Sequence, residues 1–497
     1  MQLGEAMSRI RKDIATLGAG WSPELEWYAK AVRALQALPP SDRTSWRYLG
    51  AMHGFIEDRW KELGILQPGD PLPPEAEWDG RMWNQCQHQG WWFLPWHRAY
   101  LWAFEDIVAA KVAELGGPAD WALPYWNYLD TTNAQARDWP AAFVDATLPD
   151  GSPNPLSDVP RDGVSPLGPQ PDFPDLDITL EAVTTVHFYT SGPGGRGLGG
   201  GRTLFNQFGG KTGALEGDPH NAVHVMIGGG EGFMSDPFLA GLDPIFWLHH
   251  CNVDRLWAAW LARAGNVQEN GDAWRDGPAP RRFEIPDAAG NLVVFHPSET
   301  LPGERLAPTY DDITAGTGLG ALPAGVEEEP GAMNASLSSD SPPEATVIGA
   351  NDEAVTVVDG PVATTVAFDP EQTGIAFAGD EQRVLLNLEN VRGSAPSGVL
   401  TISIRPRQPG VAPAADVPPT VVKSVALFGL EIASADDGPH AGGGISMAVD
   451  VTDLLKKLGQ DAGSPLEELE VRLEQPGGPS KKPITVERVS LYRQAAG

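Results

Sequence analysis

Apolar residues recur every three or four positions over much of the first half of the chain. The pattern is clear from about residue 22 to 130, in runs such as ELEWYAKAVRALQAL and HRAYLWAFEDIVAAKVAEL, and returns from about Pro219 to Ala264. This spacing places apolar side chains on one face of a helix. Residues 140–217 are rich in Pro, Gly and Asp and lack a period, which predicts long loops. The first part of the chain is therefore predicted to be mainly helical.

A different pattern begins after residue 325. Residues 326–352 are poor in hydrophobic residues and rich in Gly, Pro, Ser and acidic residues, as is typical of an exposed linker. Short alternating runs follow, with one helical turn near DVTDLLKKLG: AVTVVDGPVATTVAF, RVLLNLENV, GVLTISIRP, SVALFGLEI and ITVERVSLYR. Such runs predict strands of an antiparallel β-sandwich. We expect a mainly helical domain over 1–325, a linker over 326–352 and a β-sandwich domain over 353–497.

Charge narrows the range of partners. The formal net charge of the 497-residue chain is -31, which would repel nucleic acids and anionic membranes. A neutral or cationic small substrate agrees better with this charge. The N-terminal sequence lacks an unbroken apolar core, and no apolar run reaches the length of a membrane span. We expect a soluble protein that binds neither nucleic acid nor a membrane. We expect it to be cytoplasmic, with export assisted by a partner protein as the alternative.

The placement of histidines is the strongest chemical signal. Seven of the ten fall in the two helical blocks: His53, His88 and His97 in the first, and His220, His224, His249 and His250 in the second. His220 and His224 are four positions apart, so their rings leave one face of a helix. Adjacent helical positions diverge by about a hundred degrees, so only one of His249 and His250 is expected to bind an ion. Clustered imidazoles with few thiols favour copper, zinc, iron or nickel.

Two motifs around these histidines resemble those of the type 3 copper proteins, which include tyrosinases, catechol oxidases and hemocyanins. The first is H-x4-F-L-P-W-H-R-x2-L-x3-E from His88 to Glu105, and the second is D-P-x-F-W-x2-H-x3-D from Asp243 to Asp254. The resemblance implies a four-helix bundle that holds two copper ions. It implies copper A ligands His53, His88 and His97, copper B ligands His220, His224 and His250, and His249 beside them.

The resemblance also implies an activity. Tyrosinases and polyphenol oxidases oxidise phenols and o-diphenols to o-quinones with O2, and we expect the same here. An o-aminophenol oxidase, or a strict catechol oxidase, is the main alternative, and an O2 carrier like hemocyanin is a weaker one. The C-terminal part is similar to the β-sandwich of plant polyphenol oxidases. It is expected either to be a lid that keeps the enzyme latent or to be a permanent structural partner.

Glu216 and Asn221 match the pair that the family is proposed to use to hold a basic water beside copper B. Such a water would help a phenol to lose its proton. The alternative is structural: Glu216 caps the start of a helix, and Asn221 bonds a loop carbonyl.

The remaining site residues are assigned with alternatives. Cys86 precedes His88 by two positions, and the resemblance implies a thioether to this histidine; the alternatives are a free thiol and a disulfide to Cys251. Met234 or Phe233 is the candidate gate over copper A, and Met234 is preferred; core packing is the alternative. Asn252 and Asp254 are expected to orient the copper-binding imidazoles through hydrogen bonds, and Arg255 is expected to pair with Asp254. The alternative is that Asp254 and Arg255 form an ordinary helix salt bridge.

Overall fold

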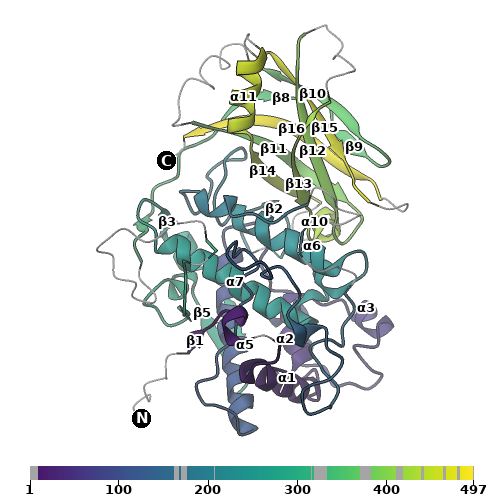
Figure 1. Cartoon of the computed structure of the whole chain (residues 1–497), viewed down its shortest axis with the longest axis vertical. Helices are drawn as coiled ribbons and strands as arrows, with labels where there is room; N and C mark the ends of the chain where they lie inside the picture. The colour runs from purple at the N-terminus through teal and green to yellow at the C-terminus, as the bar shows by residue number, and fades with distance from the viewer. Residues whose placement is uncertain are drawn as a thin grey trace.

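The computed structural model describes residues 9–18, 20–161, 167–168, 176–205, 207–314, 316–317, 333–369, 382–409, 418–437, 442–462, 466–477 and 482–495. Helices and long loops fill one end of the molecule, and a large curled sheet fills the other (Figure 1). We call residues 9–317 the helical region and residues 344–495 the β region. Within the described part of the chain, every helix is too short or too polar to span a bilayer.

Four longer helices form the core of the helical region: α1 (Pro23–Gln36), α2 (Trp46–His53), α5 (Phe93–Glu114) and α7 (Pro244–Leu261). Helix α7 begins at Pro244, where the Asp243 side chain accepts a hydrogen bond from the backbone N–H of Ile245. Helices α5 and α7 are buried on nearly every face and pack together, with the rings of Phe104 and Trp247 stacked 3.5 Å apart. These helices are therefore an interior scaffold.

Shorter elements complete the region. The π-helical η5 (Glu216–Asn221) continues into α6 (Ala222–Gly228). The other short helices are η1 (Ile14–Leu17), α3 (Glu57–Glu62), α4 (Glu75–Glu77), η2 (Trp78–Met82), η3 (Ala141–Phe143), η4 (Glu181–Thr184), η6 (Phe233–Ser235), η7 (Ala240–Leu242), α8 (Asp272–Arg275) and η8 (Pro297–Thr300). Small strand pairs are β1 (Ile10–Arg11) with β6 (Thr309–Tyr310), β3 (Val267–Glu269) with β7 (Ser336–Ser338), and β4 (Phe283–Pro286) with β5 (Leu292–Phe295).

The β region is one hydrogen-bonded sheet of mostly antiparallel strands. Its order is β13-β12-β15-β10-β8-β16-β11-β14-β2, with β9 paired to β16. The strands are β8 (Thr346–Ala350), β9 (Val355–Val357), β10 (Val362–Phe368), β11 (Gln382–Gly393), β12 (Val399–Arg407), β13 (Thr420–Ala426), β14 (Ile445–Asp450), β15 (Glu468–Glu474) and β16 (Ile484–Ala495). Helices α10 (Leu430–Ser434) and α11 (Thr452–Ala462) interrupt them, and α11 coincides with the expected helical turn. The edge strand β2 (Gly210–Lys211) comes from the helical region, so the sheet joins the two regions.

Two local expectations differ from the structure. The expected linker over 326–352 contains β7, which pairs with β3, and β8, which pairs with β10 and β16; its residues 326–332 lie outside the described part of the chain. The run SVALFGLEI is not a single strand, because β13 ends at Ala426 and α10 begins at Leu430. Gly429 between them has a positive φ of 77°, which ends the extended conformation. Alternation alone does not predict this turn.

Candidate metal centre

The first group of possible metal ligands consists of His53, His88 and His97, together with Cys86. His53 ends α2, His88 lies in the loop before α5, and His97 lies near the start of α5. All four side chains are buried, and their donor atoms lie within 4.8 Å of one another. Residues from three separate segments therefore converge on one point.

The second group consists of His220, His224, His249 and His250. His220 and His224 come from the η5–α6 segment and the other two from α7, and their donor atoms also lie within 4.8 Å of one another. The two groups touch: the rings of His97 and His250 stack at 4.5 Å, and those of His88 and His220 lie 5.8 Å apart. The arrangement can hold two metal ions side by side.

Hydrogen bonds orient most of these rings. The Nδ1 atoms of His53, His97 and His224 donate to the backbone oxygens of Pro237, Phe93 and Met234 at 2.8, 2.8 and 2.7 Å, and Nδ1 of His220 bonds Oδ1 of Asn221 at 2.8 Å. The opposite nitrogens, Nε2 of His53 and of His220, are buried without a hydrogen-bond partner among the described residues. A buried nitrogen in this state fits a metal ligand, because a metal would replace the hydration that burial removes.

Electrostatics favour the same role. Burial lowers the pKa of every histidine in both groups, to about 4 for His53 and well below the ordinary value for the others. The rings are therefore neutral at physiological pH and keep the lone pair that binds a metal. Donors that are almost all imidazole fit copper better than magnesium or calcium, which prefer oxygen.

His249 lies closer to the other three histidines of the second group than expected for a helical neighbour of His250. Its Nδ1 bonds the hydroxyl of Tyr128 at 2.9 Å, and its Nε2 is buried with no partner in the described chain. The Nε2 of the neighbouring His250 lies 3.3 Å from Nε2 of His224. Two adjacent rings can reach one point because each ring nitrogen lies several bonds from the backbone and can turn toward the centre.

Glu216 and Asn221 lie beside the second group. Glu216 is completely buried, and its carboxylate accepts two contacts from the backbone N–H of Gln89 at 2.8 and 3.0 Å. Burial raises the pKa of Glu216 to about 8. The Nδ2 of Asn221 is buried and has no partner among the described residues. A carboxyl group that titrates near neutral pH and a free amide donor are thus present next to the histidines.

Cys86 lies against the first group. Its Sγ is 3.4 Å from Nδ1 and 3.8 Å from Nε2 of His88, and 3.3 Å from Nε2 of His97. Cys86 and Cys251 are both buried free thiols, and burial raises the pKa of each. The disulfide alternative is therefore absent from this structure.

The candidate gate residues have other surroundings. Met234 is fully buried, and it is its backbone oxygen that contacts His224. Phe233 is partly buried and packs against the hydrophobic core. These contacts match core packing and backbone support of a ligand.

The expected pairing of Asp254 with Arg255 is replaced by other contacts. The Asp254 carboxylate accepts from Arg98, Arg11 and Tyr310, whereas Arg255 donates to Oδ1 of Asn252 and of Asn127. The reason is that α5, β1 and β6 pack against α7 and bring cationic and hydroxyl groups to Asp254. None of this could be deduced from positions along one helix. These contacts fasten α7 to the neighbouring segments.

Two aromatic residues that the sequence analysis does not single out cover the histidines. Phe428, in the turn between β13 and α10, stacks on His224 at 4.2 Å and lies 5.6 Å from His88 and 5.9 Å from His220. Phe208 stacks on His88 at 4.2 Å. Both side chains are fully buried. The β region thus contributes one ring directly to the centre.

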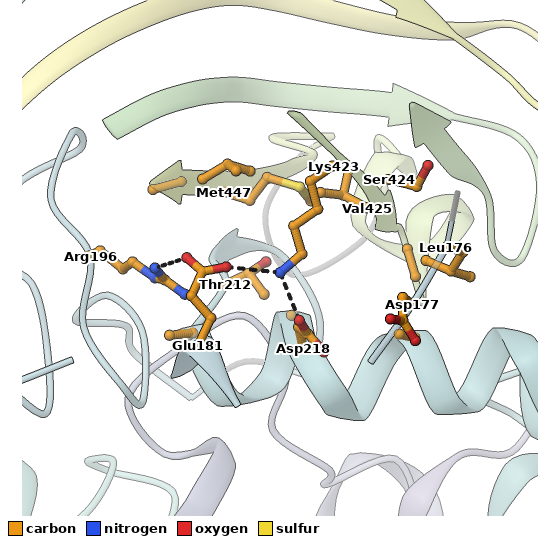
Figure 2. Close-up of a pocket in the computed structure, with 17 residues that line it drawn as sticks. Leu176, Asp177, Glu181, Arg196, Thr212, Asp218, Lys423, Ser424, Val425 and Met447 are labelled. Carbon is orange, nitrogen blue, oxygen red and sulfur yellow. Dashed lines mark hydrogen bonds and ion pairs between the residues drawn. The ribbon is translucent and has the colours of Figure 1, made fainter. Parts of the chain in front are cut away.

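An ion-pair cluster joins the two regions (Figure 2). Lys423 on β13 lies 2.7 Å from Asp218 and 3.2 Å from Glu181, and Glu181 also pairs with Arg196. We call these four residues the Lys423 cluster. Burial alone would lower the pKa of Lys423, but the attraction of Asp218 and Glu181 outweighs it and raises the pKa. The ion pairs of Lys423 therefore connect the β region to the helical region.

The fold and the site define a class: a protein in which helices hold two adjoining groups of buried, neutral imidazoles as a dinuclear metal centre. Comparison with known proteins supports this class. Residues 43–263 match the common central domain of tyrosinase, and residues 344–494 match a domain of unknown function (DUF7868). Tyrosinase HcTyr1 from Hahella sp. (strain CCB-MM4) is 34% identical over 496 residues, covering 95% of this chain and 97% of that protein. The chain belongs to the tyrosinase family.

More distant relatives share the fold. The chloroplastic polyphenol oxidase of Malus domestica is 25% identical over 304 residues, which cover 58% of this chain and 46% of that protein. The structure of latent apple tyrosinase superposes with a TM-score of 0.61 at 19% identity, covering 100% of this chain and 99% of that one. The protein is therefore a type 3 copper oxidoreductase with a dinuclear copper centre, and it oxidises phenolic substrates with O2.

Proposed function

We propose that the chain oxidises both phenols and o-diphenols to o-quinones at copper A, held by His53, His88 and His97, and copper B, held by His220, His224 and His250. The observation that carries this proposal is the contact between two groups of neutral imidazoles. In each group one Nε2, that of His53 or of His220, is buried without a partner among the described residues. His249 lies next to copper B as a neighbour hydrogen-bonded to Tyr128. The two copper ions would supply the electron transfer between substrate and O2.

We extend the proposal to the architecture. A four-helix bundle built from α2, α5, α6 and α7 surrounds the site, and the β region is an antiparallel sandwich. The catalytic domain covers 1–325, the linker 326–352 and the β domain 353–497. The matches at residues 43–263 and 344–494 support a division into two domains.

Glu216 is the residue that would allow hydroxylation of a simple phenol. A phenol has an ordinary pKa of about 10, so little phenolate is present at neutral pH. A base whose own pKa lies near neutrality accepts a proton efficiently, and burial raises the pKa of Glu216 to about 8. Asn221, through its unpartnered Nδ2, would hold a water between this carboxylate and the substrate.

The test is a copper count combined with a substrate panel. Purified, copper-loaded protein is assayed with phenol, catechol and o-aminophenol, with a trace of diphenol as primer. We expect two copper ions per chain and turnover of phenol and catechol. Turnover of catechol or o-aminophenol alone supports the narrower oxidase. A reversible blue form with O2 and no quinone supports a carrier.

Cys86 is proposed to form a thioether with His88, since its Sγ lies within 4 Å of both ring nitrogens and hence faces the carbon between them. In this bond a C–S linkage replaces the S–H and ring C–H bonds, and O2 accepts the two electrons and two protons. An intact mass short by two hydrogens that persists under strong reductant is expected. A full mass in reductant indicates a free thiol.

We also propose that the β region keeps the enzyme latent. Phe428 occupies the space above His224 and His88 where a substrate ring would approach the centre. The Lys423 cluster and the β2–β14 pairing hold the β region in this position. Limited proteolysis between the regions is expected to raise turnover, and unchanged turnover would indicate a permanent structural partner.

A further inference from the structure

His88 differs from the other proposed copper ligands in how its ring is held. Four of the six have an Nδ1 that bonds an oxygen, as described above. Within the described chain, neither nitrogen of His88 has such a bond; its recorded polar contacts are to Sγ of Cys86. His250 also lacks an oxygen partner, but it lies on the long helix α7. His88 lies in a loop, and the proposed thioether to Cys86 would hold only one edge of its ring, so the face of the ring needs another form of support.

Phe208 is placed to provide it. Its ring lies parallel to that of His88, with 4.2 Å between centroids and 11° between planes. The other rings near His88 are more distant and more inclined, at 5.3 Å and 85° for His53 and 5.4 Å and 69° for His97. Stacked contact across one whole face resists rotation of the imidazole out of its plane.

The backbone around Phe208 is fastened to the same loop. The N–H of His88 donates to the oxygen of Gln207 at 3.0 Å, and the N–H of Gly209 donates to Oε1 of Gln89 at 2.7 Å. Nε2 of Gln207 donates to the backbone oxygen of His53 at 3.1 Å. These three bonds set the position of the Phe208 ring relative to two proposed ligands of copper A.

We infer that Phe208 is a positioning residue that holds the His88 imidazole in the orientation needed to bind copper A. The inference rests on the proposed assignment of His88 as a ligand. Phe208 touches no reacting atom in this role. It acts by limiting rotation of the ring, so that the nitrogen remains directed at the metal after each dissociation event and the ion is recaptured.

The test measures copper release. Phe208→Leu removes the ring but keeps an apolar side chain of similar size, and Phe208→Tyr keeps the ring. Copper-loaded full-length protein is mixed with a coloured chelator, and release is followed by absorbance, with electron paramagnetic resonance to detect centres that retain one copper(II). We expect the leucine variant to release its first copper about tenfold faster than the unaltered protein, and the tyrosine variant to match the unaltered protein.

Phe188→Leu is the matched control. Phe188 is equally buried, but its ring neighbours are Trp257, Trp260 and Trp274, away from the histidines. Release of copper at the normal rate from this variant supports the inference. Equal acceleration in both leucine variants, or normal release from Phe208→Leu, would overturn it.

Two further measurements separate this inference from its premises. His88→Ala must bind only one copper ion; if it binds two, the ligand assignment is wrong, whatever Phe208 does. Phe208 also lies under the β region, because a Cβ atom added at Gly429 would come within 2.3 Å of its ring. The release assay is therefore repeated with Phe428→Ala. If Phe208→Leu still accelerates copper release when Phe428→Ala is also present, positioning of His88 is supported. If the acceleration disappears, the effect of Phe208→Leu came only from its contact with the β region.

Discussion

The helical region and the β region contribute to the same site in opposite ways. The helical region directs eight donor atoms, from four helical segments and a loop, into two adjoining groups. The β region contributes the ring of Phe428, which lies on the imidazoles and offers no metal ligand. One region thus builds the centre, and the other places an aromatic ring on it; under the proposed latency, that ring limits access. Substitutions in the first should lower activity or stability, whereas substitutions at the contact in the second should raise activity.

The largest expected effect is loss of a ligand in the helical region. His97→Ala leaves one copper with two protein ligands, so we expect turnover of catechol to fall about a thousandfold or more, since the metal carries the redox chemistry. Metal analysis should show about one copper per chain. His296→Ala, at a histidine outside both groups, should change neither value. Normal turnover by His97→Ala would show that His97 is not a copper ligand.

The second prediction concerns the buried acid of the same region. In copper-free protein, the pKa of Glu216 is raised from 4.5 to about 8, so the folded state binds a proton more tightly than the unfolded state. Stability from this group is present below about pH 4.5 and is lost as pH rises toward 8, at about 1.4 kcal/mol per pH unit. Denaturant unfolding at several pH values should show this slope.

Glu216→Gln should remove that slope, because the amide does not titrate. Glu344→Gln, at an exposed residue of the β region, should retain it. Parallel pH dependence in the Glu216→Gln variant and the unaltered protein would mean that Glu216 is not the group responsible.

The next largest effect on turnover is expected when the Phe428 ring is removed from above the histidines. Phe428→Ala removes the ring above His224, so we expect turnover of catechol by the full-length chain to rise about tenfold, toward the value after proteolysis; loss of one or two aromatic contacts is enough for this factor. Leu473→Ala, which truncates a buried side chain on β15, should destabilise the sheet without the rise. A cleaved enzyme that is more active while Phe428→Ala is not would place the block elsewhere.

The smallest effect is expected at the Lys423 cluster. Lys423→Ala breaks its contacts with Asp218 and Glu181 and should raise turnover about two- to fivefold, because partly exposed ion pairs contribute roughly 0.5–1 kcal/mol. Arg405→Ala, which breaks a pair with Glu470 inside the sheet, should leave turnover unchanged. An equal rise in both variants would indicate general loosening of the sheet. Turnover is measured at low and moderate salt, since screening should reduce the difference.

Local patterns predicted helices and strands well where the residues of one stretch alone favour the element. The helical block expected from about Pro219 to Ala264 contains α6 and α7, and α11 appears at the expected turn. The same patterns do not show where a short segment pairs with a distant part of the chain. Strands β7 and β8 formed within the expected linker because β3, β10 and β16 offer free backbone groups. The partners of Asp254 likewise come from β1, α5 and β6.

The sequence by itself determined which residues can bind metal: spacing put His220 and His224 on one face, and two motifs marked the histidines that meet in the structure. Only the tertiary structure decided what surrounds them. Phe428 and His88 are far apart in the sequence, and the alternating run that contains Phe428 resembles an ordinary strand. The physical reason is that periodicity reports which face of an element is buried, but not which distant surface buries it. That choice depends on the packing of the whole chain.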